Sequence, residues 1–395
     1  MSGFDKRLTV AATLPEDADR ATLVGRVWLP GDTPGPGIVT VRDGQLWDLT
    51  PLCRTMSELC EAVDPVAIAR SPEARPIGPL APVLANSRWD RRDPALPWLL
   101  APIDLQAVKA AGVTFARSML ERVVEEQVKG DPTRAAAIRG RIEELVGADL
   151  RAVRPGSDAA TRLKEHLVAQ GAWSQYLEVG IGPDAEIFTK TQPMASVGHG
   201  AEVGVHPVSR WNNPEPELVL VVNSEGAIIG ATLGNDVNLR DVEGRSALLL
   251  GKAKDNNGSS SLGPFIRLLD DGYGLDDLRA AEIGLTIEGE EGFRLAATSS
   301  MREISRDVTE LAGHAIGPHH AYPDGLVLFC GTMFAPVADR DAPGLGFTHH
   351  PGDLVAIATS RLGTLVNRVE DCTRLPRWDF GTGALMRNLA ARGLL

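Results

Sequence analysis

Cysteine is scarce in this sequence, and the few cysteines lie far apart. The 395 residues contain four of them, Cys53, Cys60, Cys330 and Cys372, with no C-x-x-C pair and no zinc-like spacing. A disulfide framework or a zinc site would need a more regular arrangement. We therefore expect four free thiols, as in proteins of the reducing cytoplasm.

Positive charge and long hydrophobic runs are lacking as well. The formal net charge is −12 and no basic tract interrupts it, which argues against nucleic acid or an anionic membrane as the partner. No run of about 18 apolar residues could cross a bilayer, and the N-terminal segment lacks the apolar stretch of an export signal. The sequence thus predicts a cytoplasmic protein with a small-molecule partner.

What is present suffices for a large core. Hydrophobic residues make up 43% of the chain and charged residues 23%, and neither repeats nor low-complexity segments stand out. This composition is typical of a globular protein with one main domain and a smaller one.

The N-terminal region has the pattern of a small β-rich unit. Short apolar runs between residues 22 and 49 are separated by turns that contain glycine and proline, and residues 52–70 have a helical pattern. The Pro-rich segment that follows, SPEARPIGPLAPV, indicates a domain boundary. We therefore expect a small α+β domain at residues 1–80 and the main domain at residues 81–395.

Helical patterns follow this boundary. Apolar residues recur at helical spacing over residues 104–129, and Asp104 is a plausible N-cap. Charged helices are expected at residues 132–146 and 158–170. These form a helical insertion at about residues 130–172, for which a packing or lid role without chemistry is favoured.

Strand patterns dominate the rest of the chain. Hairpin-like runs lie between residues 187 and 370, with one helix expected near residues 305–313. Because the helices are grouped apart from the hairpins, the sequence predicts an α+β fold. We expect a mixed β-roll with outer helices, preceded by the small β-rich N-terminal domain.

Carboxylates are concentrated in the stretch from residue 213 to 264. Glu215 and Glu217 are two residues apart at the start of an apolar run, so on a strand they project from the same face. The turn sequence NSEG then reverses the chain into a second apolar run that leads to Asp236. Such a hairpin brings three carboxylates together, and they would repel one another unless a cation lay between them.

The donors in this cluster are all hard oxygen atoms. They favour Mg²⁺, with Mn²⁺ or Ca²⁺ as alternatives, over zinc. A solvated face with Asp236 capping a turn is the competing interpretation. Two features oppose it: Pro214 and Pro216 hold the glutamates in an extended backbone, and Lys252 or Lys254 can carry an ammonium group to a buried acidic site.

Taken in order, these motifs resemble the fumarylacetoacetate hydrolase superfamily. The series comprises Glu215-x-Glu217-Leu, Asp236 with Arg240-Asp241, and Lys254 followed by Gly263-Pro264. The surrounding segments, such as GPDAEIFTK and GATLGNDVNLRD, are similar to the branch that dehydrates 2-keto-3-deoxy-D-xylonate or 2-keto-3-deoxy-D-arabinonate. The resemblance, over roughly residues 100–370, implies a catalytic domain of this type that forms a homodimer or homotetramer.

One departure from the hydrolases of the superfamily has a chemical consequence. Those enzymes carry a motif of the kind G-x-N-Y-x-x-H-x-x-E, whose His-Glu pair activates water. The matching segment runs from Gly112 to Glu121, and Ser118 stands at the histidine position. A hydroxyl cannot act as a base near neutral pH without another base beside it. Hydrolysis is therefore disfavoured, and a dehydration that needs no activated water fits better.

The resemblance also assigns roles to individual residues. The metal ligands would be Glu215, Glu217 and Asp236. The proton-transfer residues would be Glu186 and Lys254. The substrate contacts would be Ser118, Thr332 and Arg240. Judged without the resemblance, Glu186 could equally lie on a strand surface, Thr332 could belong to the core, and Lys252 could replace Lys254.

The implied activity is metal-dependent dehydration of a 2-keto-3-deoxy-D-pentonate to 2,5-dioxopentanoate, the semialdehyde of 2-oxoglutarate, in pentose catabolism. Loss of a C3 proton would lead to expulsion of the C4 hydroxyl, and burial near a metal would lower the pKa of Lys254 enough for base chemistry. A hydrolase or decarboxylase of a diketo acid in the same superfamily is the main alternative. A sugar-acid binding protein and a structural protein are further alternatives.

Overall fold

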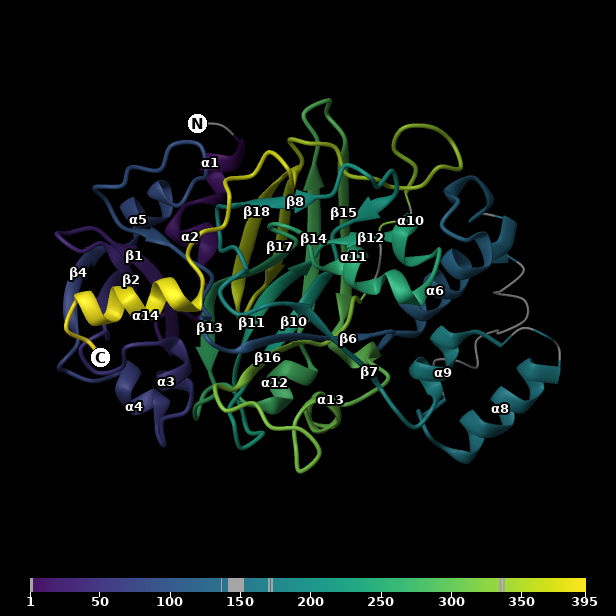
Figure 1. Ribbon diagram of the computed structural model, residues 1–395, viewed down its shortest axis with the longest axis horizontal. Helices are drawn as coiled ribbons and strands as arrows, with labels where there is room; N and C mark the ends of the chain where they lie inside the picture. Colours follow the sequence, from purple (N-terminus) through teal and green to yellow (C-terminus); the bar gives the residue numbers. More distant parts are fainter. Residues whose placement is uncertain are drawn as a thin grey trace.

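Two mixed sheets dominate the protein (Figure 1). The computed structural model describes residues 3–135, 137–140, 153–169, 171, 173–333, 336 and 338–395. Within these residues, one sheet has 11 strands and a second has five. Nearly all neighbouring strands are antiparallel, with parallel pairing at one position in each sheet. The α+β class with mixed sheets, predicted from the sequence, is confirmed.

The larger sheet joins strands from both ends of the chain. In spatial order it contains β4 (Arg75–Pro79), β3 (Gln45–Asp48), β2 (Gly35–Arg42), β1 (Leu23–Leu29), β13 (Ser260–Leu268), β11 (Ile228–Asp236), β10 (Pro216–Val222), β16 (Leu326–Phe329), β6 (Ala107–Gly112) and β7 (Glu186–Thr191), and β5 (Trp98–Leu99) pairs with β1. The N-terminal strands predicted between residues 22 and 49 thus continue the same sheet as the carboxylate hairpin.

The smaller sheet packs on the hairpin. Its strands are, in spatial order, β15 (Arg294–Ser300), β14 (Glu282–Glu288), β17 (Leu354–Thr359), β18 (Gly363–Asp371) and β8 (Glu202–Val205), and a separate short ladder pairs β12 (Asn238–Leu239) with β9 (Asn212–Asn213). Leu218, Leu220 and Val222 of β10 share one core with β14 and β17. Val219 and Val221 point to the other core, because successive strand residues alternate between faces. Strand β10 is therefore buried on both sides.

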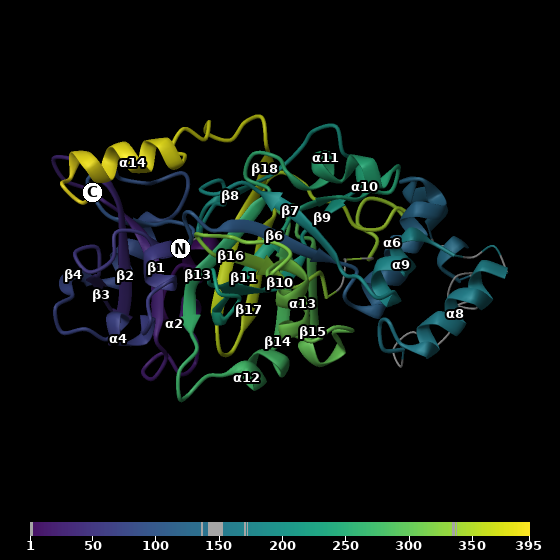
Figure 2. The ribbon, with the colours of Figure 1, turned by 60° about the horizontal axis from the view of Figure 1, so that its bottom comes forward.

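The helices lie around and beyond the sheets. Their bounds are α1 Gly3–Arg7, α2 Val10–Thr13, α3 Met56–Cys60, α4 Pro65–Ala69, α5 Leu80–Asn86, α6 Ala116–Val128, α8 Asp158–Ala169, α9 Gln175–Ile181, α10 Arg240–Glu243, α11 Leu250–Lys254, α12 Leu275–Arg279, α13 Val308–Ala315 and α14 Thr382–Ala391, with 3₁₀ turns at Pro132–Arg134, Ala247–Leu249 and Met301–Glu303. Figures 1 and 2 show α6, α8 and α9 at the opposite end of the molecule from β1 to β4. No helix in the described part of the chain is long and apolar enough to cross a membrane.

The helix predicted over residues 104–129 is partly wrong. Its first half is the strand β6, hydrogen-bonded between β16 and β7, and the helix α6 begins only at Ala116. A strand buried in the middle of a sheet need not alternate apolar and polar residues, so its apolar spacing can imitate a helix. Asp104 does cap a helix, but a different one: its carboxylate accepts hydrogen bonds from the N–H groups of Met56 (2.6 Å) and Ser57 (3.0 Å) at the start of α3.

The other helical predictions have separate outcomes. The helix expected at residues 158–170 is confirmed as α8, and the one near residues 305–313 as α13. The helix expected at residues 132–146 begins with the 3₁₀ turn Pro132–Arg134, and residues 141–152 lie outside the described residues.

The domain boundary near residue 80 stays a prediction. Leu80, Val83 and Leu84 of α5 share a core with β1 and β2, so this segment packs with the N-terminal strands that precede it. The C-terminal helix α14 also contacts them, because Asn388 Nδ2 donates to Pro34 O (2.8 Å) and Arg392 Nη1 donates to Pro36 O (2.6 Å).

Removing core volume from β10 should destabilise the protein. Leu220 is completely buried, and Leu220→Ala should lower the free energy of unfolding by about 2–5 kcal/mol because it leaves a cavity between the sheets. Val63, which is fully exposed, offers a control of the same kind, and Val63→Ala should change stability by less than about 0.5 kcal/mol. Urea unfolding followed by circular dichroism measures both values. Similar losses in the two variants would contradict this packing.

Candidate active site

Three carboxylates meet where the β10–β11 hairpin opens. The ladder pairs Glu217 with Gly234, and the N–H of Asp236 donates to the carbonyl oxygen of Glu215 (3.0 Å). All three acidic side chains are buried, and one oxygen atom of each lies within 4.8 Å of the others. The convergence of Glu215, Glu217 and Asp236 that the sequence predicts is therefore present.

Two lysine ammonium groups neutralise Asp236. Lys190 Nζ, from β7, lies 2.8 Å from Asp236 Oδ1, and Lys254 Nζ, from α11, lies 3.0 Å from Oδ2. Lys254 also pairs with Glu215. Burial alone would raise the pKa of Asp236, but the two lysines outweigh it and lower that pKa. Asp236 is therefore ionised in this arrangement.

Glu217 has a different environment. Its Oε2 accepts a hydrogen bond from the N–H of Gly331 (2.7 Å), and in the described part of the chain no lysine or arginine lies within ion-pair distance of it. Burial, reinforced by the negative charges of Asp236 and Glu215, raises the pKa of Glu217 well above its ordinary value. Glu217 thus retains a proton to higher pH than an exposed glutamate does.

Arg122, on α6, supplies a cation from the helical side. One amino group pairs with Glu215, while the other, Nη1, lies 2.7 Å from Glu125 and 2.9 Å from Glu243. Burial alone would lower the pKa of Arg122, but the three carboxylates raise it. This guanidinium therefore ties α6 to the hairpin and to α10.

A small cavity of about 10 Å³ lies between these groups, which is room for about one water molecule. Its polar lining residues are Ser118, Arg122, Glu186, Glu215, Glu217, Asp236, Glu243, Lys254 and Thr332. Two of the three expected substrate contacts, Ser118 and Thr332, are among them. Ser118 Oγ donates to the carbonyl oxygen of Phe115 (2.9 Å), so its lone pairs remain available to a ligand.

Glu186 approaches this cavity because its strand partner is a glycine. The β6–β7 ladder pairs Gly112 with Glu186, and a Cβ at position 112 would lie 1.9 Å from Glu186 Oε2. Any other residue at 112 would displace the carboxylate. Burial, with a further contribution from the negative charge of Glu243, raises the pKa of Glu186 to about 7. Such a carboxyl group can accept and release protons near neutral pH.

Lys254 departs from the expectation of a lowered pKa. Burial alone would lower it, but Asp236, Glu215 and Glu243 outweigh burial and raise the pKa of Lys254 above that of an ordinary lysine. The ammonium form is therefore favoured, which suits a proton donor rather than a base. Lys252, the competing residue, is exposed and is absent from the cavity lining, so the geometry favours Lys254.

Arg240 and Glu121 are not brought to the cavity. Arg240 Nε lies 2.7 Å from Glu125, and its Nη2 lies 3.0 Å from Glu121. Its guanidinium also stacks on Trp211, with 4.2 Å between the guanidinium carbon and the ring centre. Glu121 is engaged by Arg139 as well (2.6 Å). The geometry thus gives Arg240 a role in holding α6 in place and does not support the expected substrate contact.

Sequence reasoning missed three charged residues of the site: Lys190, Arg122 and Glu243. Lys190 follows Glu186 at an even spacing on one strand, so the two side chains share a face. Arg122 follows Ser118 by one helical turn on α6. These periodicities were available signals. Glu243 gave no comparable signal, because its place depends on how α10 packs against α6.

The donor set fits a hard divalent cation. Glu215, Glu217 and Asp236 offer only carboxylate oxygen atoms, in a site with no sulfur or imidazole donor among the described lining residues. Glu217 is the carboxylate that lacks a cationic partner, and a bound metal would replace its proton. Lys254 contacts the other two carboxylates, so it competes with a metal for the same oxygen atoms.

Comparison with known proteins gives a consistent assignment. A family model described as the C-terminal part of fumarylacetoacetate (FAA) hydrolase matches residues 160–370. A 2-dehydro-3-deoxy-D-arabinonate dehydratase from Saccharolobus solfataricus is 33% identical over 185 residues, which cover 47% of this chain and 58% of that protein. A probable 2-keto-3-deoxyxylonate dehydratase from Haloferax volcanii is 32% identical over 194 residues, covering 49% and 63%. The chain therefore spans about three fifths of the length of these relatives.

Solved structures share the fold. A crystal form of 2-keto-3-deoxyarabinonate dehydratase matches with a TM-score of 0.60 and 21% identity, covering 88% of this chain and 99% of the other. A complex of 2-keto-3-deoxy-D-arabinonate dehydratase with magnesium and 2,5-dioxopentanoate matches with a TM-score of 0.59 at the same identity and coverage. At this identity the likeness establishes the fold alone.

Removing the third carboxylate should abolish tight metal binding. Glu217→Gln should weaken Mg²⁺ binding at least about 100-fold, because the metal loses a ligand and its charge. Glu225→Gln, in the exposed turn of the same hairpin, is the matched control and should leave affinity unchanged. Isothermal titration calorimetry measures both.

The same titration, repeated at several pH values, tests the protonation of Glu217. Binding of Mg²⁺ must release the proton of Glu217, whose pKa is raised, so affinity in the natural protein should increase with pH. If Glu217→Gln bound Mg²⁺ normally, or if affinity did not depend on pH, the metal would be held elsewhere.

Proposed function

The chain belongs to the fumarylacetoacetate hydrolase family, whose model matches more than half of it, and we propose that it dehydrates a 2-keto-3-deoxy-D-pentonate to 2,5-dioxopentanoate with Mg²⁺ as cofactor. The observation that carries this proposal is that Glu186 and Lys254 line the same small cavity as the buried carboxylate triad. The curated relatives bear the names of dehydratases that act on such acids. The substrate thus belongs to oxidative pentose breakdown.

A dehydration agrees with the residues that line the cavity. Ser118 occupies the position at which hydrolases of this family carry a histidine, and no histidine lines the described cavity. Water therefore has no imidazole base to activate it. This argues against hydrolysis of a diketo acid, whereas decarboxylation needs no activated water. Analysis of the products formed from oxaloacetate and from a 1,3-diketo acid therefore tests both parts of the alternative, a hydrolase or decarboxylase of a diketo acid.

The metal and the cavity wall have distinct tasks. A divalent cation bound by Glu215, Glu217 and Asp236 would supply Lewis acidity to the oxygen atoms at the keto-acid end of the substrate. Ser118 and Thr332 then orient the substrate by hydrogen bonds to its carboxylate or hydroxyl groups. Arg122 holds Glu215 in place and excludes water from the helical side.

Glu186 and Lys254 divide the proton transfers. Glu186 takes a proton from C3, and the electron pair of that C–H bond moves towards the C2 carbonyl group, which gives an enolate. The pair then returns to form the double bond between C3 and C4 as the C4 hydroxyl departs. Lys254 donates the proton with which this hydroxyl leaves as water. In a second proton shift, C5 loses a proton and C3 gains one, which gives an enol at C4 and C5. Transfer of the enol hydroxyl proton to C4 then produces the aldehyde. This division follows from the different environments of the two groups. Burial raises the pKa of Glu186 to about 7, so that its carboxylate is a stronger base than an exposed one, while three carboxylates keep Lys254 charged.

We further propose a cytoplasmic homodimer or homotetramer. The four cysteines are buried and unpaired, as is usual in a reducing compartment. Leu248 is 95% exposed beside the short helix that carries Lys254, and a subunit contact would cover it. Sedimentation that returns only monomer at micromolar concentration would contradict the oligomer.

Glu186→Gln should remove the base. The variant should fold and bind Mg²⁺, but its kcat should fall about 10²- to 10⁴-fold. In the natural enzyme, kcat should increase with pH through the pKa of Glu186, because only the carboxylate can accept the C3 proton. Asp184→Asn, in the exposed turn just before β7, is the control. Normal turnover by Glu186→Gln would assign the base elsewhere. So would loss of C3 proton exchange with D₂O in Lys254→Met if Glu186→Gln retained that exchange.

Lys254→Met should separate dehydration from enolisation. The variant keeps all three metal ligands and loses a competing cation, so Mg²⁺ affinity should be retained or increased. The rate of 2,5-dioxopentanoate formation should fall about 10²- to 10⁴-fold, while exchange of the C3 protons in D₂O continues. Lys252→Met is the matched control, because its exposed side chain lies two residues away. Dehydration at the normal rate in Lys254→Met would overturn its role as the acid.

A further inference from the structure

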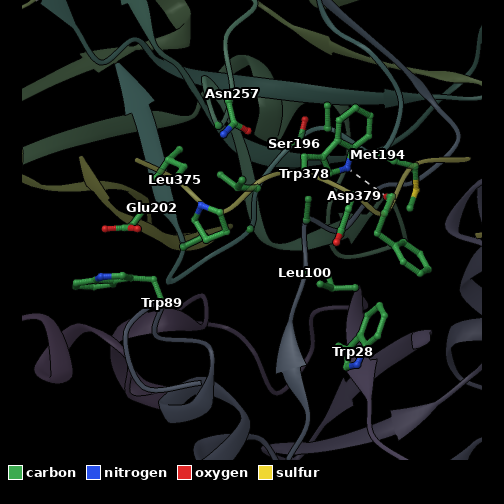
Figure 3. Close-up of a pocket in the computed structure, with 18 of the residues that line it drawn as sticks. Trp28, Trp89, Leu100, Met194, Ser196, Glu202, Asn257, Leu375, Trp378 and Asp379 are labelled. Atoms are coloured by element: carbon green, nitrogen blue, oxygen red, sulfur yellow. Dashed lines mark hydrogen bonds between the residues drawn. The ribbon is translucent and has the colours of Figure 1, made fainter. Parts of the chain in front are cut away.

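A second, much larger cavity lies between the N-terminal strands and the C-terminal segment (Figure 3). Its volume is about 320 Å³, compared with about 10 Å³ at the carboxylates. The walls come from β1, from residues 99–101 and 194–198, and from residues 375–380. The volume lies within the range of small-ligand sites, about 300–1,000 Å³. None of the three metal-ligand candidates lines it.

Aromatic rings form much of this lining. Trp28, Trp89, Trp378 and Phe380 contribute to it. Trp28 stacks on Trp98, with ring centres 5.6 Å apart and planes inclined by 16°. Phe380 and Trp28 form an edge-to-face pair with ring centres 5.1 Å apart. Four aromatic side chains left partly open to solvent are costly unless something covers them.

Trp378 in particular presents its ring rather than its polar edge. Its Nε1 donates a hydrogen bond to the carbonyl oxygen of Phe380 (3.2 Å), and the side chain is 39% exposed. In Figure 3 the labelled Trp378, Met194 and Leu100 surround the cavity from different segments of the chain. The satisfied donor leaves an indole face free to stack on a flat ligand.

The charged groups of the lining give the cavity a positive character. In the described part of the chain, neither Arg92 nor Arg377 has a carboxylate within ion-pair distance. Arg92 donates to the carbonyl oxygen of Ser87 (3.3 Å) and lies over the ring of Trp98. Of the two acidic lining residues, Glu202 is paired with Arg368 (2.7 Å), which leaves only Asp379.

Two arginines without acidic partners are notable in a chain with a net charge of −12. Carboxylates are abundant on this protein, yet none among the described residues lies within ion-pair distance of either guanidinium group. Arginine binds carboxylate and phosphate groups in a bidentate manner and also stacks on aromatic rings. A ligand that combines a flat apolar body with an anionic group would satisfy both the rings and the arginines.

We propose that this cavity is a second binding site, for a planar aromatic ring that bears a negative charge, and that it is linked to the metal site. The ring packs on Trp28 and Trp378, and its anionic group meets Arg92 and Arg377. The carboxylate of Asp379 and the side-chain carbonyl oxygen of Asn257 line the same cavity and can accept hydrogen bonds from the ring edge. Nucleotides and aromatic carboxylic acids share this chemistry.

The link runs through a short loop. Asn257 and Gly258 line the cavity and follow Lys254 by only a few residues. Asn257 Nδ2 donates to the carbonyl oxygen of Cys372 (3.2 Å), and a Cβ at Gly258 would lie 2.6 Å from Leu375 Cδ1. Displacement of the segment at 375–380 by a ligand would therefore press on the loop that positions Lys254. Since Lys254 competes with a metal for Glu215 and Asp236, occupancy of the cavity should change Mg²⁺ affinity, and Mg²⁺ should change ligand affinity by the same factor.

The binding test uses two fluorescent probes of the same shape on the full chain. One is 8-anilinonaphthalene-1-sulfonate (ANS), and the other is N-phenyl-1-naphthylamine, which lacks the sulfonate. Trp378→Ala should weaken ANS binding roughly three- to tenfold, because a stacking face is lost. The double variant Arg92→Gln, Arg377→Gln should weaken ANS at least roughly fivefold and leave the neutral probe unchanged.

Matched controls separate this site from general surface binding. Trp173→Ala removes a partly buried indole between α8 and α9, and Arg374→Gln removes an exposed arginine just before the lining segment. Both should bind ANS normally. ANS binding that is unchanged in Trp378→Ala and in the double arginine variant would overturn the site.

Two further measurements complete the test. Displacement of ANS by adenosine monophosphate or by 4-hydroxybenzoate identifies the source of the ligand, and failure of both would overturn the proposed ligand class. Saturating ANS should shift Mg²⁺ affinity in the natural protein and not in Trp378→Ala, and an unchanged affinity would overturn the link. These readouts do not depend on turnover, so they stand apart from the dehydratase proposal. If Trp378→Ala instead halved the molar mass in sedimentation without altering ANS binding, the cavity would be a subunit contact.

Discussion

The arrangement of the protein depends on the electrostatic cost of three carboxylates that are buried within 4.8 Å of one another. An uncompensated buried charge costs several kcal/mol, so the chain must bring positive charge to this point. It does so from three directions: Lys190 on β7, Lys254 on α11 and Arg122 on α6 all reach the cluster. Among the described residues, Glu217 has no such cation beside it, and burial with the neighbouring carboxylates raises its pKa, so it keeps a proton to higher pH than an exposed glutamate does. The same oxygen atoms that require these partners are the ones that suit a divalent metal, so structural neutrality and cofactor binding are two outcomes of one arrangement.

The same cluster of buried carboxylates also gives the two proton-transfer candidates, Glu186 and Lys254, different properties. Glu186 lies at the edge of the cluster, where burial and the negative charge of Glu243 disfavour ionisation, and its pKa is about 7. Lys254 lies inside the cluster, where three carboxylates stabilise its charge. One acidic environment thus raises both pKa values, with different consequences: the carboxyl group can exchange protons near neutral pH, whereas the ammonium group keeps its charge. Residue types alone could not have assigned these roles.

The sequence was informative where structure is local. The β10–β11 hairpin and its three carboxylates follow from alternation and a short turn, and Lys254 was chosen over Lys252 from a motif. Prediction failed where tertiary contacts decide. Strand β6 was taken for a helix because burial between two strands removes the alternation that identifies a strand. Arg240 was expected at the substrate, yet Glu121 and Glu125, on a helix more than a hundred residues earlier, hold its guanidinium. No spacing rule connects groups that meet only through the packing of distant segments.

Strand β13 joins the two ends of the molecule. Its first residue, Ser260, pairs with Asp236 of β11, at the carboxylate cluster. Near its other end, Ile266 and Arg267 pair with β1. The loop just before β13 holds Lys254 through a hydrogen bond from Ser259 Oγ to the Lys254 carbonyl oxygen (2.8 Å). Because a close-packed interior has low compressibility and transmits strain, a change at the aromatic cavity beside β1 can reach Lys254 by this loop more readily than through the sheet itself. The loop, unlike the strand, has few ladder hydrogen bonds to resist the displacement.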